Sequence, residues 1–117
     1  MSHKTTAQDV KYFAARVRHW QKALSLGDWK IEAYIGDCGE NSAQAEMWHN
    51  EHGAHIKLRE TFSYKPGREF LNCLALHEVS HLLLCDLKRL IFERGSTEAQ
   101  ANTAEHAIIR RLENLLS

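Results

Sequence analysis

The stretch His77-Glu78-Val79-Ser80-His81 is an H-E-x-x-H motif surrounded by helix-forming residues. On a helix, positions 77 and 81 differ by about 40° around the axis and by about 6 Å along it. Both imidazoles therefore project from one face and can bind a single zinc ion. Glu78 falls on the flank of that face, where its carboxylate can take a proton from a metal-activated water and pass it to a leaving amine. The motif predicts two metal ligands, His77 and His81, and a general base, Glu78, for amide hydrolysis.

The alternative interpretation is that His77 and His81 are ordinary core histidines with satisfied hydrogen bonds. The chain contains eight histidines, so the motif can also arise by chance. The surroundings favour a metal, because burying two histidines and a glutamate without partners is costly. The apolar residues around the motif are Leu71, Leu74, Ala75, Leu76, Val79, Leu82, Leu83 and Leu84. We therefore expect a zinc site at the motif.

Length and composition restrict the class of protein. The 117 residues predict a single domain, residues 1–117, with the 44% hydrophobic and 26% charged content of an ordinary globular protein. The net charge is zero and no lysine or arginine block is present, which argues against nucleic acid or an anionic membrane as a partner. No apolar run could span a bilayer, and residues 1–8 carry no signal segment, so we expect a cytoplasmic protein. Three cysteines cannot all pair with one another, which predicts reduced thiols.

Helical spacing predicts three helices. Residues 6–26 form an amphipathic pattern that begins with a capping box of Thr6 and Asp9 and is expected to end at Gly27. The motif helix should begin near residue 67 and run to about residue 92. Thr97 and Gln100 predict a capping box for a last helix that ends near residue 116. The residues that this last helix is expected to bury are Ala101, Ala104, Ile108, Leu112 and Leu115.

Alternating apolar and polar residues predict three strands at residues 29–35, 43–48 and 55–59. Their links are short and rich in turn residues, which predicts an antiparallel meander. The fold class is therefore α+β: an N-terminal helix, a three-stranded antiparallel sheet, the long motif helix and a C-terminal helix. We expect the third strand, residues 55–59, to form the sheet edge beside the cleft, where an extended substrate could pair with it.

The third zinc ligand has three candidates on the last helix, Glu98, Glu105 and His106. The motif helix continues for about 14 Å beyond His81, so an antiparallel helix that starts near residue 97 comes level with His81 near residue 106. Glu98 lies about two turns short of that level. His106 is level but points about 100° away from the face that carries Glu105 and Ile108. Geometry therefore favours Glu105, with His106 and Glu98 as alternatives.

The order of these features resembles the small gluzincin-type metallopeptidases, especially short H-E-x-x-H proteins of phages and prophages. The resemblance rests on the helix, the three-strand segment after Gly27-Asp28-Trp29, the motif helix with its leucine run, and the sequence Glu105-His106-Ala107-Ile108-Ile109-Arg110-Arg111-Leu112. It implies a zinc-dependent peptidase in a minimal zincin-like domain, acting on a protein or peptide inside a bacterial host, with Glu105 as the third ligand.

The chain departs from the larger gluzincins in two respects. They often carry a carboxylate four residues after the ligand glutamate, where this chain has Ile109. They also have a second subdomain that supplies a histidine or tyrosine to the oxyanion, for which 117 residues leave no room. Tyr64, His55 and His106 remain candidates for that role.

Other residues carry weaker indications. Cys73 and Cys85 flank the motif at four-residue spacing, but successive steps of four drift by about 40°, which favours small buried hydrophobes over thiolate ligands. His49, His52 and His55 cluster around a turn, where a second metal site is an alternative to exposed turn residues. Two rival functions are a zinc-stabilised protein-interaction module without catalysis and a SprT-like DNA-associated protease. Glu78 disfavours the first, and neutral charge disfavours the second.

Overall fold

Three helices and five short strands make up the part of the chain that the computed structural model describes, residues 2–48, 51–95 and 97–116. The elements in chain order are β1 (His3–Lys4), α1 (Ala7–Ala23), β2 (Lys30–Gly36), β3 (Ala43–Trp48), β4 (Gly53–Arg59), β5 (Thr61–Phe62), α2 (Arg68–Glu93) and α3 (Glu98–Leu116). The α+β class is confirmed. Among the described residues, none of the helices combines the length and the apolarity needed to cross a bilayer.

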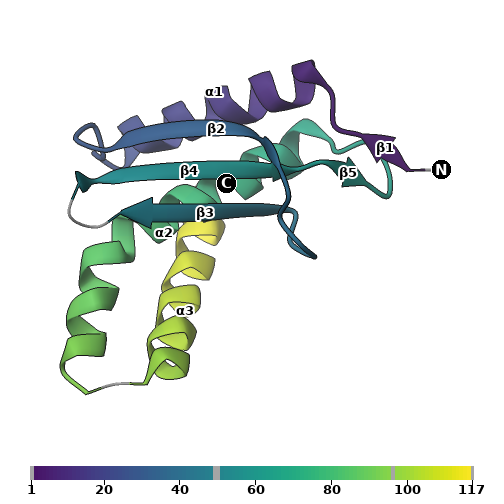
Figure 1. Cartoon of the computed structure of the whole chain (residues 1–117). Helices are drawn as coiled ribbons and strands as arrows, with labels where there is room; N and C mark the ends of the chain where they lie inside the picture. The colour runs from purple at the N-terminus through teal and green to yellow at the C-terminus, as the bar shows by residue number, and fades with distance from the viewer. Residues whose placement is uncertain (1, 49–50, 96, 117) are drawn as a thin grey trace.

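The main sheet has the strand order β2-β4-β3, with β4 parallel to β2 and antiparallel to β3 (Figure 1). The predicted antiparallel meander is therefore wrong, and so is the placement of the third strand at an edge. The segment between β2 and β3 leads from one edge of the sheet to the other, and β4 then pairs with both strands between them. Burial explains this order, because the inward side chains Ala54, Ile56 and Leu58 of β4 are at most 1% exposed, as expected for a central strand. The edge beside α2 is β3.

One face of the sheet is covered by α1 and α2, and the core lies between them (Figure 1). The alternation of β4 and the helical periodicity of α1 and α2 direct their apolar side chains into this layer. The completely or almost completely buried side chains include Phe13, Val17, Ile56, Leu58, Leu76, Val79 and Leu82. The opposite face of the sheet is open and exposes Tyr34 and Trp48. The motif helix is thus fixed to the sheet by its apolar neighbours.

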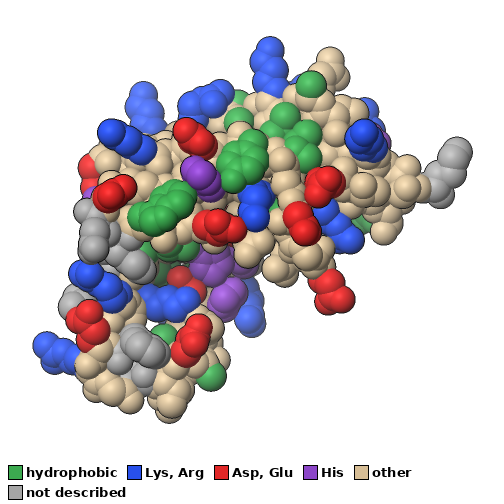
Figure 2. Space-filling model, viewed as in Figure 1, with side chains coloured by type: hydrophobic (Ala, Val, Ile, Leu, Met, Phe, Trp, Pro, Cys, Tyr) green, Lys and Arg blue, Asp and Glu red, His purple; other side chains and the backbone are tan. Residues whose placement is uncertain are grey.

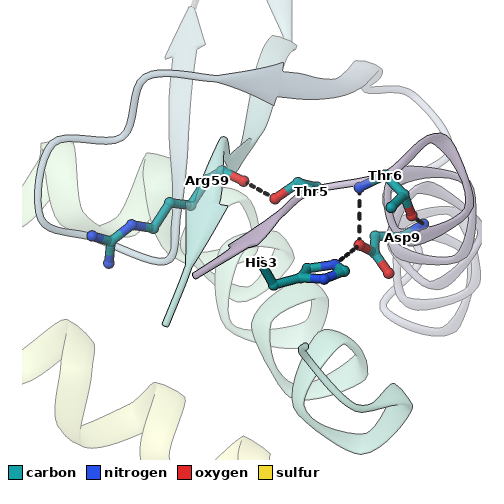
Figure 3. A network of polar contacts seen from close by, with 5 residues as sticks. All are labelled: His3, Thr5, Thr6, Asp9 and Arg59. Carbon is teal, nitrogen blue, oxygen red and sulfur yellow. Dashed lines mark hydrogen bonds and ion pairs between the residues drawn. The ribbon is translucent and has the colours of Figure 1, made fainter. Parts of the chain in front are cut away.

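The start of α1 is fixed by polar contacts (Figure 3). Thr6 caps the helix and forms the predicted capping box with Asp9. Nε2 of His3 lies 2.8 Å from Oδ2 of Asp9, and the Thr5 hydroxyl donates to the carbonyl of Arg59. Burial alone would raise the pKa of Asp9, but hydrogen bonds from the Thr6 backbone, the His3 ring and the Thr6 hydroxyl outweigh it and lower that pKa. These contacts hold β1 against β5 in a two-stranded sheet that the sequence did not predict.

The end of α1 differs from the prediction. The helix ends at Ala23 rather than at Gly27, and the reversal is made by Ser25, whose φ is +59°. Gly27 lies beyond the helix end. The predicted helix, residues 6–26, is therefore three residues too long at its end, because serine rarely adopts a left-handed conformation and was not expected to make the reversal.

The last helix packs against α2 as an antiparallel partner, and the two project away from the sheet (Figure 1). Its capping box between Thr97 and Gln100 is confirmed by hydrogen bonds of 3.0 and 3.1 Å. The predicted burial is confirmed for Ala101 but not for the rest of the predicted face. Glu105 and Ile109 are buried, whereas Ala104 is exposed, Leu112 is half-buried, Ile108 is 37% exposed and Leu115 is 78% exposed. The helix is thus rotated relative to the prediction, and His106 and Glu113 also lie on its packed side, half-buried.

Candidate metal centre

The two motif histidines converge on the surface of α2. Their Nε2 atoms lie 3.2 Å apart. Two nitrogens at 2.0–2.1 Å from a tetrahedral zinc ion would be separated by about 3.3–3.4 Å. The spacing therefore matches what one zinc ion requires, and it follows directly from placing the two residues four apart in an uninterrupted helix.

His106 of α3 completes a cluster of three imidazoles. One ring nitrogen from each of His77, His81 and His106 lies within 4.8 Å of the others. The ring centroid of His106 is 5.6 Å from that of His77 and 4.9 Å from that of His81. Figure 2 shows histidine side chains gathered below β3, in the space between the sheet and the two projecting helices. The rotation of α3 brings His106, rather than the predicted Glu105, into this cluster.

The outer ring nitrogens decide the protonation of the cluster. Nδ1 of His77 faces a carboxylate oxygen of Glu113 at 3.3 Å, and Nδ1 of His81 faces one of Glu105 at 3.0 Å. Nδ1 of His106 lies 2.8 Å from the carbonyl oxygen of Asn102. Carboxylate and carbonyl oxygens only accept hydrogen bonds, so each Nδ1 must carry the hydrogen.

In the neutral form, an imidazole whose Nδ1 carries the hydrogen presents a lone pair at Nε2. Two such lone pairs 3.2 Å apart, those of His77 and His81, repel one another unless a cation lies between them. Burial and the neighbouring His81 lower the pKa of His77, and the opposing effect of Glu113 does not reverse this. The lowered pKa favours the neutral form of His77, which is the form that binds metals. The residues present therefore fit a bound zinc ion.

Glu105, the predicted third ligand, lies behind His81 rather than among the three converging nitrogens. Its side chain is only 4% exposed. Its Oε2 lies 3.0 Å from Nδ1 of His81, and its Oε1 lies 3.3 Å from Nζ of Lys88. Burial alone would raise the pKa of Glu105, but the hydrogen bond from His81 and the charges of His81 and Lys88 outweigh it and lower that pKa. In this arrangement Glu105 orients a ligand, as Glu113 does for His77. Glu98 is exposed and contributes to neither contact.

Glu78 lies in the same cavity as the histidines. It is 6% exposed, and burial raises its pKa to about 7. The nearby His81 and a hydrogen bond from the backbone N–H of Ala45 in β3 act in the opposite direction. The edge strand thus holds the motif glutamate beside the imidazoles, as the position of Glu78 in the motif predicted.

A groove runs along β3 past these residues. A cavity of 300 Å³ is lined by Glu78, the three histidines and the β3 residues from 43 to 47. A cavity of 320 Å³ adjoins it towards Asn41, and another of 420 Å³ adjoins it beyond Met47, between the distal part of α2 and the start of α3. A further cavity of 460 Å³, around Cys38 and Phe62, lies apart from the histidines.

Sequence reasoning missed Glu113 and Lys88. Both had a signal: Glu113 follows His106 by seven residues and Lys88 follows His81 by seven, so each pair shares a helix face. Neither spacing belongs to the H-E-x-x-H motif. The contact from Ala45 had no signal in the sequence, because it depends on which strand forms the edge.

The remaining candidates lie elsewhere. Cys85 is buried and Cys73 half-buried; neither forms a disulfide with a described residue, and neither belongs to the cluster. Tyr64 is 72% exposed and lines none of the three cavities of the groove. His55 lies on the open face of the sheet, 3.1 Å from the Tyr34 hydroxyl, and His52 contacts Asp28. His49 lies outside the described residues, and the described histidines of that turn form no metal-binding group.

Comparisons of this chain with protein-family models, with curated proteins and with solved structures gave no match. The resemblance to gluzincins and to phage proteins therefore stays a prediction.

Proposed function

We propose that this protein binds one zinc ion through His77, His81 and His106 and hydrolyses peptide bonds. The observation that carries the proposal is the orientation of the three imidazoles, whose Nδ1 atoms are engaged by acceptors and whose Nε2 atoms are left as lone-pair donors. Zinc is the metal that such a nitrogen set favours. When bound, the ion would activate a water molecule and polarise a carbonyl group.

The surroundings of the cluster favour catalysis over a purely structural role. Structural zinc sites are closed by four protein ligands, whereas catalytic sites have three and leave one position open. The group in the described residues has three members, and it lines a cavity of 300 Å³. Glu78 opens onto that cavity, and an interaction module that uses zinc only for stability has no need of a buried carboxylate there.

The protein's own residues have distinct roles in the proposed reaction. Glu78 would accept a proton from the attacking water and deliver it to the leaving nitrogen. Glu113 and Glu105 hold His77 and His81 in the orientation that exposes Nε2. The outer edge of β3 faces Glu78, so we place an extended substrate along β3. The sequence had predicted a substrate along β4 instead.

Metal content tests the first half of the proposal. Protein purified without added metal should contain about one zinc ion per chain, and His77→Ala and His81→Ala should lose it together with much of the stability. Elemental analysis that finds no stoichiometric metal in the wild-type protein would overturn the proposal.

Glu78→Gln tests the second half. The variant should retain zinc and its melting temperature, because Glu78 is not a ligand and glutamine has nearly its shape. Turnover of peptides from a proteome-derived library should fall by about 10²- to 10⁴-fold, the usual contribution of a positioned base. If neither protein cleaves any peptide while both bind one partner with equal affinity, the protein is a zinc-stabilised interaction module.

A further inference from the structure

The buried carboxylate of Glu105 is engaged at both oxygens, but in different ways. Oε2 accepts a hydrogen bond from Nδ1 of His81 over 3.0 Å. Oε1 is buried, and the charged group that faces it is Nζ of Lys88, at 3.3 Å. The three side chains form a chain of contacts from Lys88 through Glu105 to the candidate ligand His81.

Lys88 is placed for this contact by the geometry of α2. It follows His81 by seven residues, which puts both on one face about 10 Å apart along the axis. Side chains on a helix lean towards its N-terminus, so the lysine stem extends back in the direction of His81. Lys88 also lines the cavity that holds the three histidines, and its side chain is 35% exposed.

Lys88 supplies the second contact of this buried carboxylate. A carboxylate whose side chain is 96% buried needs more than the single hydrogen bond from His81 to compensate its burial. A carboxylate held against Nδ1 of His81 keeps the hydrogen on that nitrogen and makes Nε2 the stronger metal ligand. A lysine that touches no metal ligand can thus act on one.

We propose that Lys88 is a positioning residue of the metal site, which acts through Glu105 to hold His81 in the orientation that binds zinc. The part of this inference that concerns zinc affinity rests on the proposed function. It predicts that Lys88→Met weakens zinc binding by about 10- to 100-fold, the usual loss when the support of a ligand is removed. Lys88→Arg keeps the charge and should stay close to wild type.

The experiment is a competition titration of the full-length chain with a zinc chelator, for the variants K88M, K88R, E105Q and the double variant K88M/E105Q. K57M is the matched control, because Lys57 forms a comparable 3.0 Å ion pair with Glu46 on the open face of the sheet. K57M should bind zinc as the wild type does. In the E105Q background, K88M should cause almost no additional loss. If K88M does not fold, K88Q takes its place.

Two results would overturn the inference: a K88M protein with wild-type zinc affinity, or an equal loss from K88M with and without Glu105. If the wild type takes up no zinc, the proposed function fails and the inference is decided separately. Imidazole ¹H–¹⁵N spectra of the metal-free proteins then show whether His81 carries its hydrogen on Nδ1. We expect that tautomer in the wild type and K88R and a mixture in K88M; equal spectra for all three would refute the role of Lys88.

Discussion

Replacing His106 with alanine distinguishes a three-histidine site from one in which Glu105 is the third ligand. In the structure, His106 contributes a nitrogen within 4.8 Å of those of His77 and His81, whereas Glu105 contacts the outer nitrogen of His81. His106→Ala should therefore remove a ligand, and Glu105→Gln should leave the ligand set complete. Glutamine keeps an oxygen that can accept the hydrogen bond from His81.

The expected magnitudes differ enough to be separated. Structural zinc sites with four ligands bind with about 10–16 kcal/mol, or about 2.5–4 kcal/mol for each ligand. Loss of His106 should therefore weaken zinc binding by about 10²- to 10³-fold. Loss of the charge on Glu105 should cost at most about 10- to 100-fold, as for other groups that orient a ligand.

Competition titrations with a chelator of known affinity measure both losses in one assay. His19→Ala is a matched control, because His19 is an exposed histidine on α1, away from the cluster. The visible spectrum of the cobalt-substituted proteins reports the coordination geometry independently. If Glu105→Gln loses more affinity than His106→Ala, the carboxylate is the ligand and the register of α3 argued here is wrong.

Three further predictions test other parts of the structure. Glu113→Gln should weaken zinc binding less than His77→Ala does, by about 10-fold, since it only orients that histidine; an equal loss in the chelator titration would make Glu113 a ligand. The pKa of Asp9 in the folded protein lies below its ordinary value. The contribution of the ionised Asp9 to the free energy of unfolding is therefore complete above about pH 4 and is lost as the pH falls through the folded pKa. Denaturant unfolding should thus show Asp9→Asn less stable by about 1 kcal/mol at pH 7, with the difference shrinking in acid; a difference that is constant with pH would contradict this. Gly95→Ala should lower stability by about 1–2 kcal/mol in the same assay, because its φ of +97° is unfavourable for a side chain, and an unchanged midpoint would argue against that turn.

The sequence was sufficient for features that depend on neighbours along the chain. The spacing of His77 and His81 determined their convergence, and the pairs Thr6 with Asp9 and Thr97 with Gln100 determined two helix starts. In each case the interacting groups are three or four residues apart, so helix geometry alone sets their distance.

Features that depend on the arrangement of whole elements were not predictable. The three strands were recognised, but their alternation is the same in a meander and in the observed order β2-β4-β3. Only the packing of the completely buried face of β4 decides which strand is central. The identity of the edge strand then determines that Ala45, rather than a residue of β4, contacts Glu78.

The sequence favoured Glu105 over His106 as the third candidate ligand because a single rotation of α3 decides between them. Adjacent residues on a helix differ by 100°, so turning α3 by about one residue exchanges Glu105 and His106 in front of the motif. The apolar pattern did not fix that rotation, since the predicted stripe through Ile108 and Leu112 contains more apolar surface than the stripe that is buried. The observed stripe places Glu105 at its centre, an unfavourable position for a carboxylate unless Lys88 and His81 compensate it. The polar contacts of the site therefore act together with the buried side chains of Ala101 and Ile109 in orienting this helix, and we expect that removing Glu105 or Lys88 also weakens the packing of α3.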